Sequence, residues 1–337
     1  MAFPEQQNPL KALTGFTAGG RLTAFMRNAV RTLRVRVTVA ADVVVSVAGT
    51  GIRNRGSVVA ALSELGIVEN GVERWNGDPR MLAHFAQFYS AGRRSGGRRL
   101  TAAEAAAPAT YALRETFDLV LAPTNIASPT EAAFMEADTR QALEFFATMA
   151  SNAAARIVAG GTVAVNNLTV TAQQILDDKI GDDVVVIPTC RKIIHNINAA
   201  NTQEQVFIRS SRYLRGLLIS QDSDAGEIGD AITSIAIRGD ERDIIGPQQA
   251  PWADLVDGQY AQAGGEVDGT DAHLFVPMIR HGRLSTMYNP STDRNLRIEA
   301  NVQPSVTSGA TNAKLVVHIF EMERVAGLTV DPMPFPA

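Results

Sequence analysis

The sequence predicts a mainly β protein built from two similar sandwiches in tandem, with short helices between strands. Three observations lead to this class. Several segments alternate apolar and polar residues with a period of two, as half-buried strands do. Helical periodicity is confined to short stretches, so the repeated strand–helix alternation of a doubly wound fold is missing. The strand-like and helical segments also recur in the same order within the second half of the 337 residues.

The first half opens with an extended lead-in over residues 1–20, which contain two prolines and the Gly19-Gly20 pair. Strand signals follow in Arg31–Val39, where valine and leucine alternate with arginine and threonine, and β-branched residues continue them to Val47. Gly49–Gly56 resembles a phosphate-binding loop only in its glycine spacing. It lacks the Gly-Lys-Ser/Thr ending of such loops, and we interpret it as a turn.

A short helix is expected after Asp78-Pro79, because aspartate is a good N-cap and proline suits the first helical position. The glycines between Gly92 and Gly97 end it. Its apolar face comprises Met81, Leu82, Phe85, Phe88 and Tyr89.

The rest of the first half returns to strands, first in Thr116–Leu121. Thr130–Ala155 is rich in alanine and favours a helix by propensity, yet the repeat described below predicts that Leu143–Met149 is a strand. In Thr162–Ala172 the alternation changes phase at Asn166-Asn167, which indicates a turn or bulge.

The second half repeats this order. The strand signals of Tyr213–Ile219 and Ala231–Ile237 precede a short helical stretch that begins at Pro251, and the strands Leu296–Val302 and Lys314–Glu323 follow. The two halves align by the pairs Leu33–Leu214, Tyr89–Tyr260 and Asp138–Asp293, whose offsets are 181, 171 and 155. An offset that drifts steadily indicates an internal duplication with loops of different length.

A repeated unit of about 170 residues with many short strands is typical of a sandwich or jelly roll. The polar, acidic Ile175–Asp183 is the expected connection between the halves. The predicted organisation is an N-terminal arm over 1–20, a first jelly roll over 21–176, a linker over 177–190, a second jelly roll over 191–326 and an extended tail over 327–337.

Tandem sandwiches, one short helix in each, and an acidic chain of this length resemble the double jelly-roll major capsid proteins of tailless icosahedral phages with an internal membrane. Tectiviruses, corticoviruses and adenovirus carry proteins of this family, and the resemblance covers roughly residues 15–326. It implies a structural shell protein that forms homotrimers with a pseudo-hexagonal outline and then an icosahedral capsid. It also implies production in the host cytoplasm, residence in the virion, and contacts with other capsid or vertex proteins and with membrane lipids.

Composition limits the other functions. The net charge is −4 and the pI about 5.8, so the chain is not expected to wrap nucleic acid by charge or to bind a specific nucleic-acid sequence. Its apolar runs are shorter than the ~20 residues of a membrane helix. Cys190 is the only cysteine, which excludes an intramolecular disulfide and a zinc site with several thiolates.

No catalytic, cofactor or metal residue is predicted, and the chain is not expected to be an enzyme. A double cupin would share the duplicated fold but needs two histidines two residues apart beside a carboxylate. A nucleophilic Cys190 would need a partner such as His195, whereas a lone buried thiol is commoner. The five histidines are His84, His195, His273, His281 and His318.

Two charged clusters remain as candidate contacts. One is basic and comprises Arg93, Arg94, Arg98 and Arg99. It is either a solvated loop or a contact for anionic lipid headgroups, nucleic acid or an acidic neighbour, and its lack of aromatic residues argues against base stacking. The other cluster is acidic and comprises Asp177, Asp178, Asp182 and Asp183. It is either a solvated linker or a calcium site between subunits.

Two alternatives lie outside this family. The shell protein of a tailed phage should show a long backbone helix instead of a duplicated sandwich. A tandem carbohydrate-binding or adhesin module should expose clustered aromatic residues, and two tryptophans and five tyrosines equip this chain poorly for that task.

Overall fold

The computed structural model describes most of the chain as two compact units. Among these residues the first unit ends at Cys190 and the second begins at Arg191. The described residues are 6–27, 32–89, 96–121, 142–176, 186–197, 202–223, 226–227, 231–240, 243–252, 254–256, 273–278, 288–290, 295–302 and 313–324.

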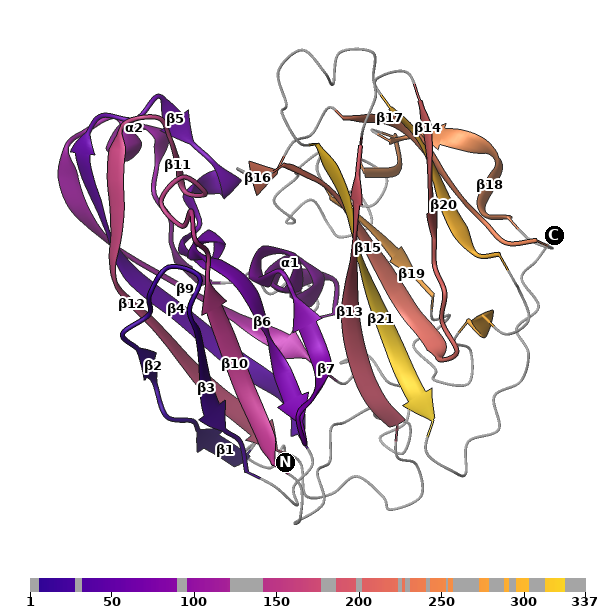
Figure 1. Ribbon diagram of the computed structural model, residues 1–337, viewed down its shortest axis with the longest axis horizontal. Helices are drawn as coiled ribbons and strands as arrows, with labels where there is room; N and C mark the ends of the chain where they lie inside the picture. The colour runs from indigo at the N-terminus through magenta and orange to yellow at the C-terminus, as the bar shows by residue number, and fades with distance from the viewer. Residues whose placement is uncertain are drawn as a thin grey trace, which may run out of the picture. The chain divides into compact units, whose positions relative to one another are not determined.

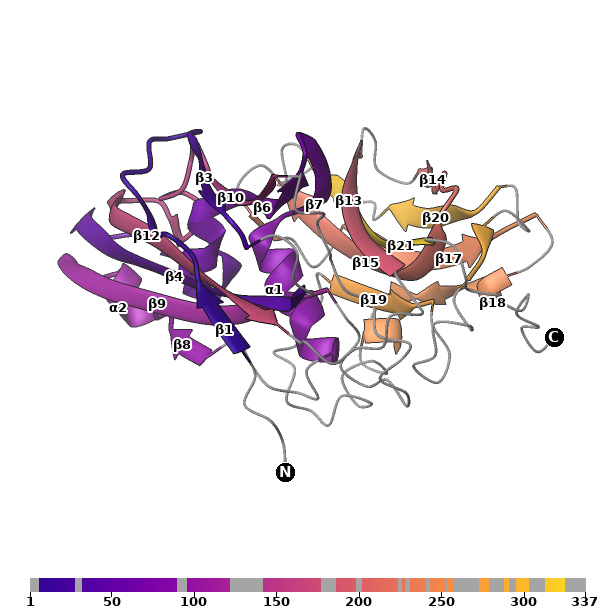
Figure 2. The ribbon, with the colours of Figure 1, turned by 90° about the horizontal axis from the view of Figure 1, so that it is seen from below.

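The first unit is a sandwich of two antiparallel sheets. One sheet has the order β1-β12-β4-β9-β8, with β2 also paired to β12, and the other has the order β7-β6-β10-β3. Figures 1 and 2 show these sheets as two layers. The strands are β1 (Gln6–Pro9), β2 (Leu13–Thr14), β3 (Arg21–Phe25), β4 (Thr32–Val47), β6 (Leu62–Glu69), β7 (Val72–Gly77), β8 (Gly96–Arg98), β9 (Ala109–Val120), β10 (Leu143–Met149) and β12 (Thr162–Leu176).

Short elements connect these strands. The strands β5 (Gly51–Ile52) and β11 (Val158–Ala159) pair with each other. The helical connections are two 3-10 turns, Asn54–Gly56 and Val58–Ala61, and the helices α1 (Pro79–Tyr89) and α2 (Ala102–Ala105).

The second unit is built in the same way. The strand β15 pairs with β16, β19 and β21, and β21 neighbours β13, while the other sheet has the order β14-β20-β17-β18. The strand β13 (Val186–Asn196) crosses the boundary and belongs to this unit from Arg191 on. The other strands are β14 (Gln203–Phe207), β15 (Tyr213–Ser223), β16 (Gly226–Glu227), β17 (Ile232–Arg238), β18 (Asp243–Pro251), β19 (His273–Pro277), β20 (Arg297–Val302) and β21 (Lys314–Arg324).

The two units share one strand order, which confirms the predicted fold of two tandem jelly rolls. In the first unit β12 lies between the N-terminal strands and β4, and β4 pairs with β9. In the second unit β21 lies in the same way between β13 and β15, and β15 pairs with β19. The other sheets also match strand for strand, as β3-β10-β6-β7 and β14-β20-β17-β18. This Greek-key sandwich is the jelly roll.

Alternation along the strands places the cores. In β4 the side chains of Val35, Val37, Val39 and Val43 are fully buried, and the residues between them face partly outward. The second unit has an equivalent cluster of buried aliphatic side chains that includes Leu217, Ile219, Ile298, Leu315 and Val317. Each sandwich therefore closes around its own apolar core, as the composition of each half predicts.

The phase change in β12 is a bulge. Its pairing with β4 shifts register between Asn166 and Thr169, and Asn167 takes a left-handed φ of 53°. Asparagine tolerates this conformation better than most residues. The predicted turn or bulge is confirmed, and the strand continues on both sides of it.

The helix α1 begins where the sequence predicts. The Asp78 carbonyl accepts the N–H of Leu82 at 3.0 Å, and the Asp78 carboxylate accepts the backbone N–H of Arg80 at 3.0 Å. Asp78 is thus the N-cap and Pro79 the first helical residue. The strand predicted for Leu143–Met149 against its helical propensity is β10, so pairing in the sheet overrides propensity there.

Three segments differ from the predicted organisation. Residues 6–14 of the expected arm form β1 and β2, which pair with β12 inside the first jelly roll. The last residues of the expected linker, Val186–Cys190, begin β13, while residues 177–185 and the tail over 327–337 lie outside the described residues. Pro251 ends β18 instead of opening a helix, and helical residues follow it from Trp252.

Candidate functional site

The basic cluster of the sequence divides between described and undescribed residues. Arg93 and Arg94 lie outside the described part of the chain. Arg98 ends β8, has a side chain that is 54% exposed, and donates to Glu104 at 2.8 Å. The backbone N–H of Thr101, and next Arg98, lower the pKa of the Glu104 carboxyl by hydrogen bonding. Arg98 is therefore a surface side chain with a carboxylate partner in its own unit.

Arg99 contacts the interior of the first unit. Its Nε donates to Glu115 at 2.5 Å, and the Glu115 side chain is only 1% exposed. The hydroxyl of Ser57 donates to the other oxygen of the same carboxylate. Since buried carboxylates require such partners, Arg99 compensates a buried charge, and only part of its side chain faces solvent.

A second buried polar network joins loops at the end of the first unit. Arg80 donates two hydrogen bonds to the Asp78 carboxylate, at 3.0 and 2.6 Å, and one to Asn54 at 2.7 Å. Arg156 donates to Asp78 at 2.9 Å, and its carbonyl accepts the amide of Asn54 at 2.6 Å. The network holds the 3-10 turn at Asn54, the start of α1 and the turn before β11 in one arrangement.

Among the described residues, Cys190 and His195 do not face each other. Cys190 is buried in β13, opposite Trp75 of β7. His195 is five residues further along β13, which points its side chain to the opposite face of the strand, and its ring contacts Glu204 at 2.7 Å. His273 and His318 are buried on β19 and β21.

The metal hypotheses find no support among the described side chains. No group of three or more His, Cys, Asp or Glu residues in that part of the chain is placed to hold a metal ion. His84 is buried in α1, while His281 and the acidic Asp177, Asp178, Asp182 and Asp183 lie outside the described residues.

No described helix is long and apolar enough to cross a bilayer.

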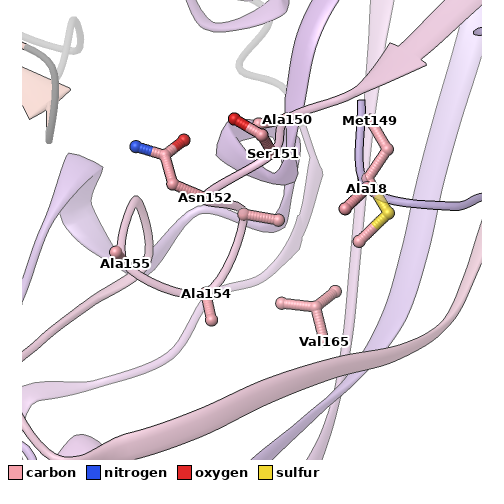
Figure 3. A pocket seen from close by; sticks show the side chains of 9 residues that line it. Ala18, Met149, Ala150, Ser151, Asn152, Ala154, Ala155 and Val165 are labelled. Atoms are coloured by element: carbon pink, nitrogen blue, oxygen red, sulfur yellow. The ribbon is translucent and has the colours of Figure 1, made fainter. Parts of the chain in front are cut away.

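Two hollows in the first unit are lined by few charged or titratable side chains. One of about 310 Å³ lies between β10, the turn that follows it and β12, and Figure 3 shows Met149, Ala154 and Val165 around it. The residues that line it are apolar or neutral and include no titratable side chain. A neighbouring hollow of about 280 Å³ adds one cation, Arg53, whose Nη1 donates to the carbonyl of Ala155 at 3.1 Å.

Exposed apolar side chains are a feature that sequence reasoning missed. Phe25 is 75% exposed at the end of β3, and Phe207 is 46% exposed at the end of β14. The strands β3 and β14 occupy the same edge in the two units. The sequence does contain a signal that relates these two phenylalanines. Phe207 follows Phe25 by 182 residues, which is close to the offset of 181 between Leu33 and Leu214.

Solved structures of viral shell proteins share this fold. The MCP of STIV aligns with a TM-score of 0.69 at 11% identity, covering 96% of this chain and 98% of that one. VP54 of PBCV-1 aligns with a TM-score of 0.62 at 10% identity, covering 96% and 95%. The major capsid protein P2 from bacteriophage PM2 aligns with a TM-score of 0.53 at 8% identity, covering 96% and 100%.

These alignments extend over nearly the whole of both chains, so the likeness includes both jelly rolls and their order. The chain matches no protein-family model and no curated protein. At identities this low the likeness establishes the fold alone. The chain has the double jelly-roll fold of viral major capsid proteins, as the sequence resemblance predicted.

Proposed function

We propose that the chain is a structural protein of an icosahedral virion, the major subunit of its shell. The observation that carries the proposal is the duplication of one jelly roll with an unchanged strand order. A trimer of such chains would contain six similar sandwiches. A trimer with threefold symmetry would then have a nearly sixfold outline, which suits a position in the shell that is surrounded by six neighbours.

The fold of known shell proteins supports this function. The solved structures similar over the full length include proteins described as the major capsid protein of bacteriophage PM2 and the MCP of STIV. A fold can host unrelated functions, but here the likeness includes the tandem arrangement and not merely one sandwich. The chain's role would be to form many weak contacts with copies of itself, without catalysing a reaction.

Several charged side chains form ion pairs within the first unit, and this also favours a structural role. Arg99 compensates Glu115, and Arg80 and Arg156 compensate Asp78. These charges hold loops and turns in place, as a rigid building block requires. The proposal extends to a homotrimer, to contacts with other capsid or vertex proteins and internal membrane lipids, and to synthesis in the host cytoplasm before incorporation into the virion.

Negative-stain electron microscopy of the purified protein, with the solution mass measured by light scattering on the same sample, tests the proposal. We expect particles with threefold symmetry, a hexagonal outline and the mass of three chains. A compact monomer or dimer would contradict the proposal and favour a tandem binding module. One tightly held iron or manganese ion per chain would favour a double-cupin enzyme.

A further inference from the structure

The dipeptide Asn-Gly occurs twice in the sequence, and both copies are among the described residues. Asn70-Gly71 joins β6 to β7, and Asn76-Gly77 lies further on, inside β7. In this dipeptide the backbone nitrogen of the glycine can attack the amide carbon of the asparagine side chain, because glycine has no side chain to hinder a close approach. Both copies share this chemistry, so their surroundings decide which of them reacts.

Asn70 and Gly71 form the whole loop of a tight hairpin. Glu69 of β6 lies opposite Val72 of β7, and the two loop residues take left-handed φ angles of 49° and 79°. Two successive positive φ angles are typical of a type I′ turn, for which Asn-Gly is a preferred sequence. Both residues are exposed, and a Cβ added at Gly71 would meet no atom within 4 Å. The space around the Gly71 backbone is therefore open to water and to a rotating side chain.

Few contacts hold the reacting groups of this loop. The N–H of Asn70 donates to the carbonyl of Ala142 at 2.8 Å. Within the described part of the chain, neither the side-chain amide of Asn70 nor the N–H of Gly71 makes a hydrogen bond. The amide can therefore turn toward the glycine nitrogen without breaking a contact, and the backbone rotation that brings the two together changes only the loop.

Asn76-Gly77 has the opposite surroundings. Asn76 lies opposite Gly66 and Gly77 opposite Leu65, so both residues are paired in the sheet. The side-chain amide of Asn76 donates to Glu73 at 2.7 Å, and Gly77 is buried. Attack by the Gly77 nitrogen would require the amide to leave Glu73 and the backbone to leave the extended conformation of a strand. The sheet therefore protects this second copy.

We infer that Asn70 is a site of spontaneous deamidation, whereas the fold protects Asn76. The nitrogen of Gly71 loses its proton and forms a bond to Cγ of Asn70, the Cγ–Nδ2 bond breaks, and the amide nitrogen leaves as ammonia with that proton. The product is a five-membered succinimide ring. Water, the only co-reactant, then opens the ring at one of its two carbonyl carbons. Breaking the new Cγ–N bond gives aspartate, and breaking the original peptide bond gives isoaspartate.

Both products change the turn between β6 and β7. Aspartate adds a negative charge at the end of the hairpin, and isoaspartate adds a methylene group to the backbone of a two-residue loop. The length of such a loop fixes the register of its strands, so isoaspartate should loosen the pair of Glu69 and Val72. Glu69 also lies opposite Leu143 of β10. The chemical change is thus expected at one exposed end of this sheet, outside the apolar core.

Peptide mapping by mass spectrometry tests the inference on the full chain. Trypsin cleaves after Arg74 and so places Asn70 and Asn76 on separate peptides. The folded protein is incubated at physiological temperature and pH and digested at intervals, and circular dichroism establishes that it stays folded. We expect Asn70 to convert roughly tenfold faster than Asn76 or more, which corresponds to a difference of about 1.4 kcal/mol in the barrier. An intact Asn70, or equal rates at the two sites, would overturn the inference.

The same experiment in urea is the matched control. Unfolding removes the hairpin, the sheet pairs and the hydrogen bond to Glu73, so Asn70 and Asn76 should then convert at similar rates. This result would show that the fold causes the difference between them. A ratio of rates that is unchanged in urea would show that the neighbouring sequence causes it, and would overturn the protective role assigned to the sheet.

Discussion

At the scale of single residues, the arginines near β8 show what a sequence can and cannot reveal. Arg98 and Arg99 are adjacent and belong to one basic cluster in the sequence, which predicts either a solvated loop or a contact site. The structure separates them, because Arg98 contacts the surface Glu104 whereas Arg99 contacts the buried Glu115. Glu115 is sixteen residues away on β9, so only the fold brings it to Arg99. The role of this cluster in binding lipid, nucleic acid or a neighbour stays a prediction.

Arg99→Ala should destabilise the protein, because it removes the guanidinium that compensates the buried Glu115 carboxylate and keeps only the neutral Ser57 hydroxyl of these two partners. Breaking a fully buried ion pair costs about 3–5 kcal/mol. Since the Arg99 side chain is 30% exposed, we expect a smaller loss of about 2–3 kcal/mol in the free energy of unfolding, measured in urea. Arg98→Ala is the control and should leave the unfolding midpoint within error of the wild type. Equal losses for the two variants would contradict this assignment.

At the scale of elements, periodicity predicts strands that bury one face and misses strands at an edge. The alternation of Arg31–Val39 predicts β4, and the phase change at Asn166-Asn167 predicts the bulge of β12. The strand β1 has the sequence QQNP, which contains no apolar alternation. It forms because β12 offers it backbone partners, and Gln6 lies opposite Leu176. Partners so distant in sequence cannot be found from local pattern.

Deleting residues 1–14 should therefore damage the first jelly roll, although the sequence predicts that these residues belong to an arm. The deletion removes the pairs of β1 and β2 with β12 and the buried side chain of Leu13. It also leaves an unpaired edge on β12, and unpaired edges promote aggregation. We expect a lower urea midpoint and aggregates in size-exclusion chromatography. Deleting residues 1–5 removes none of the described pairs and is the control, and equal behaviour of both deletions would restore the arm interpretation.

At the scale of the whole molecule, the order of segments proves more informative than any single segment. The drifting offset between the halves predicts two related units, and β4 and β15 do occupy equivalent places, as do β10 and β20. The order of strands within each sheet could not be predicted in this way, because it depends on pairs such as β4 with β12, which are distant in the chain. The equivalent positions of Phe25 on β3 and Phe207 on β14 become visible only after the strands are ordered.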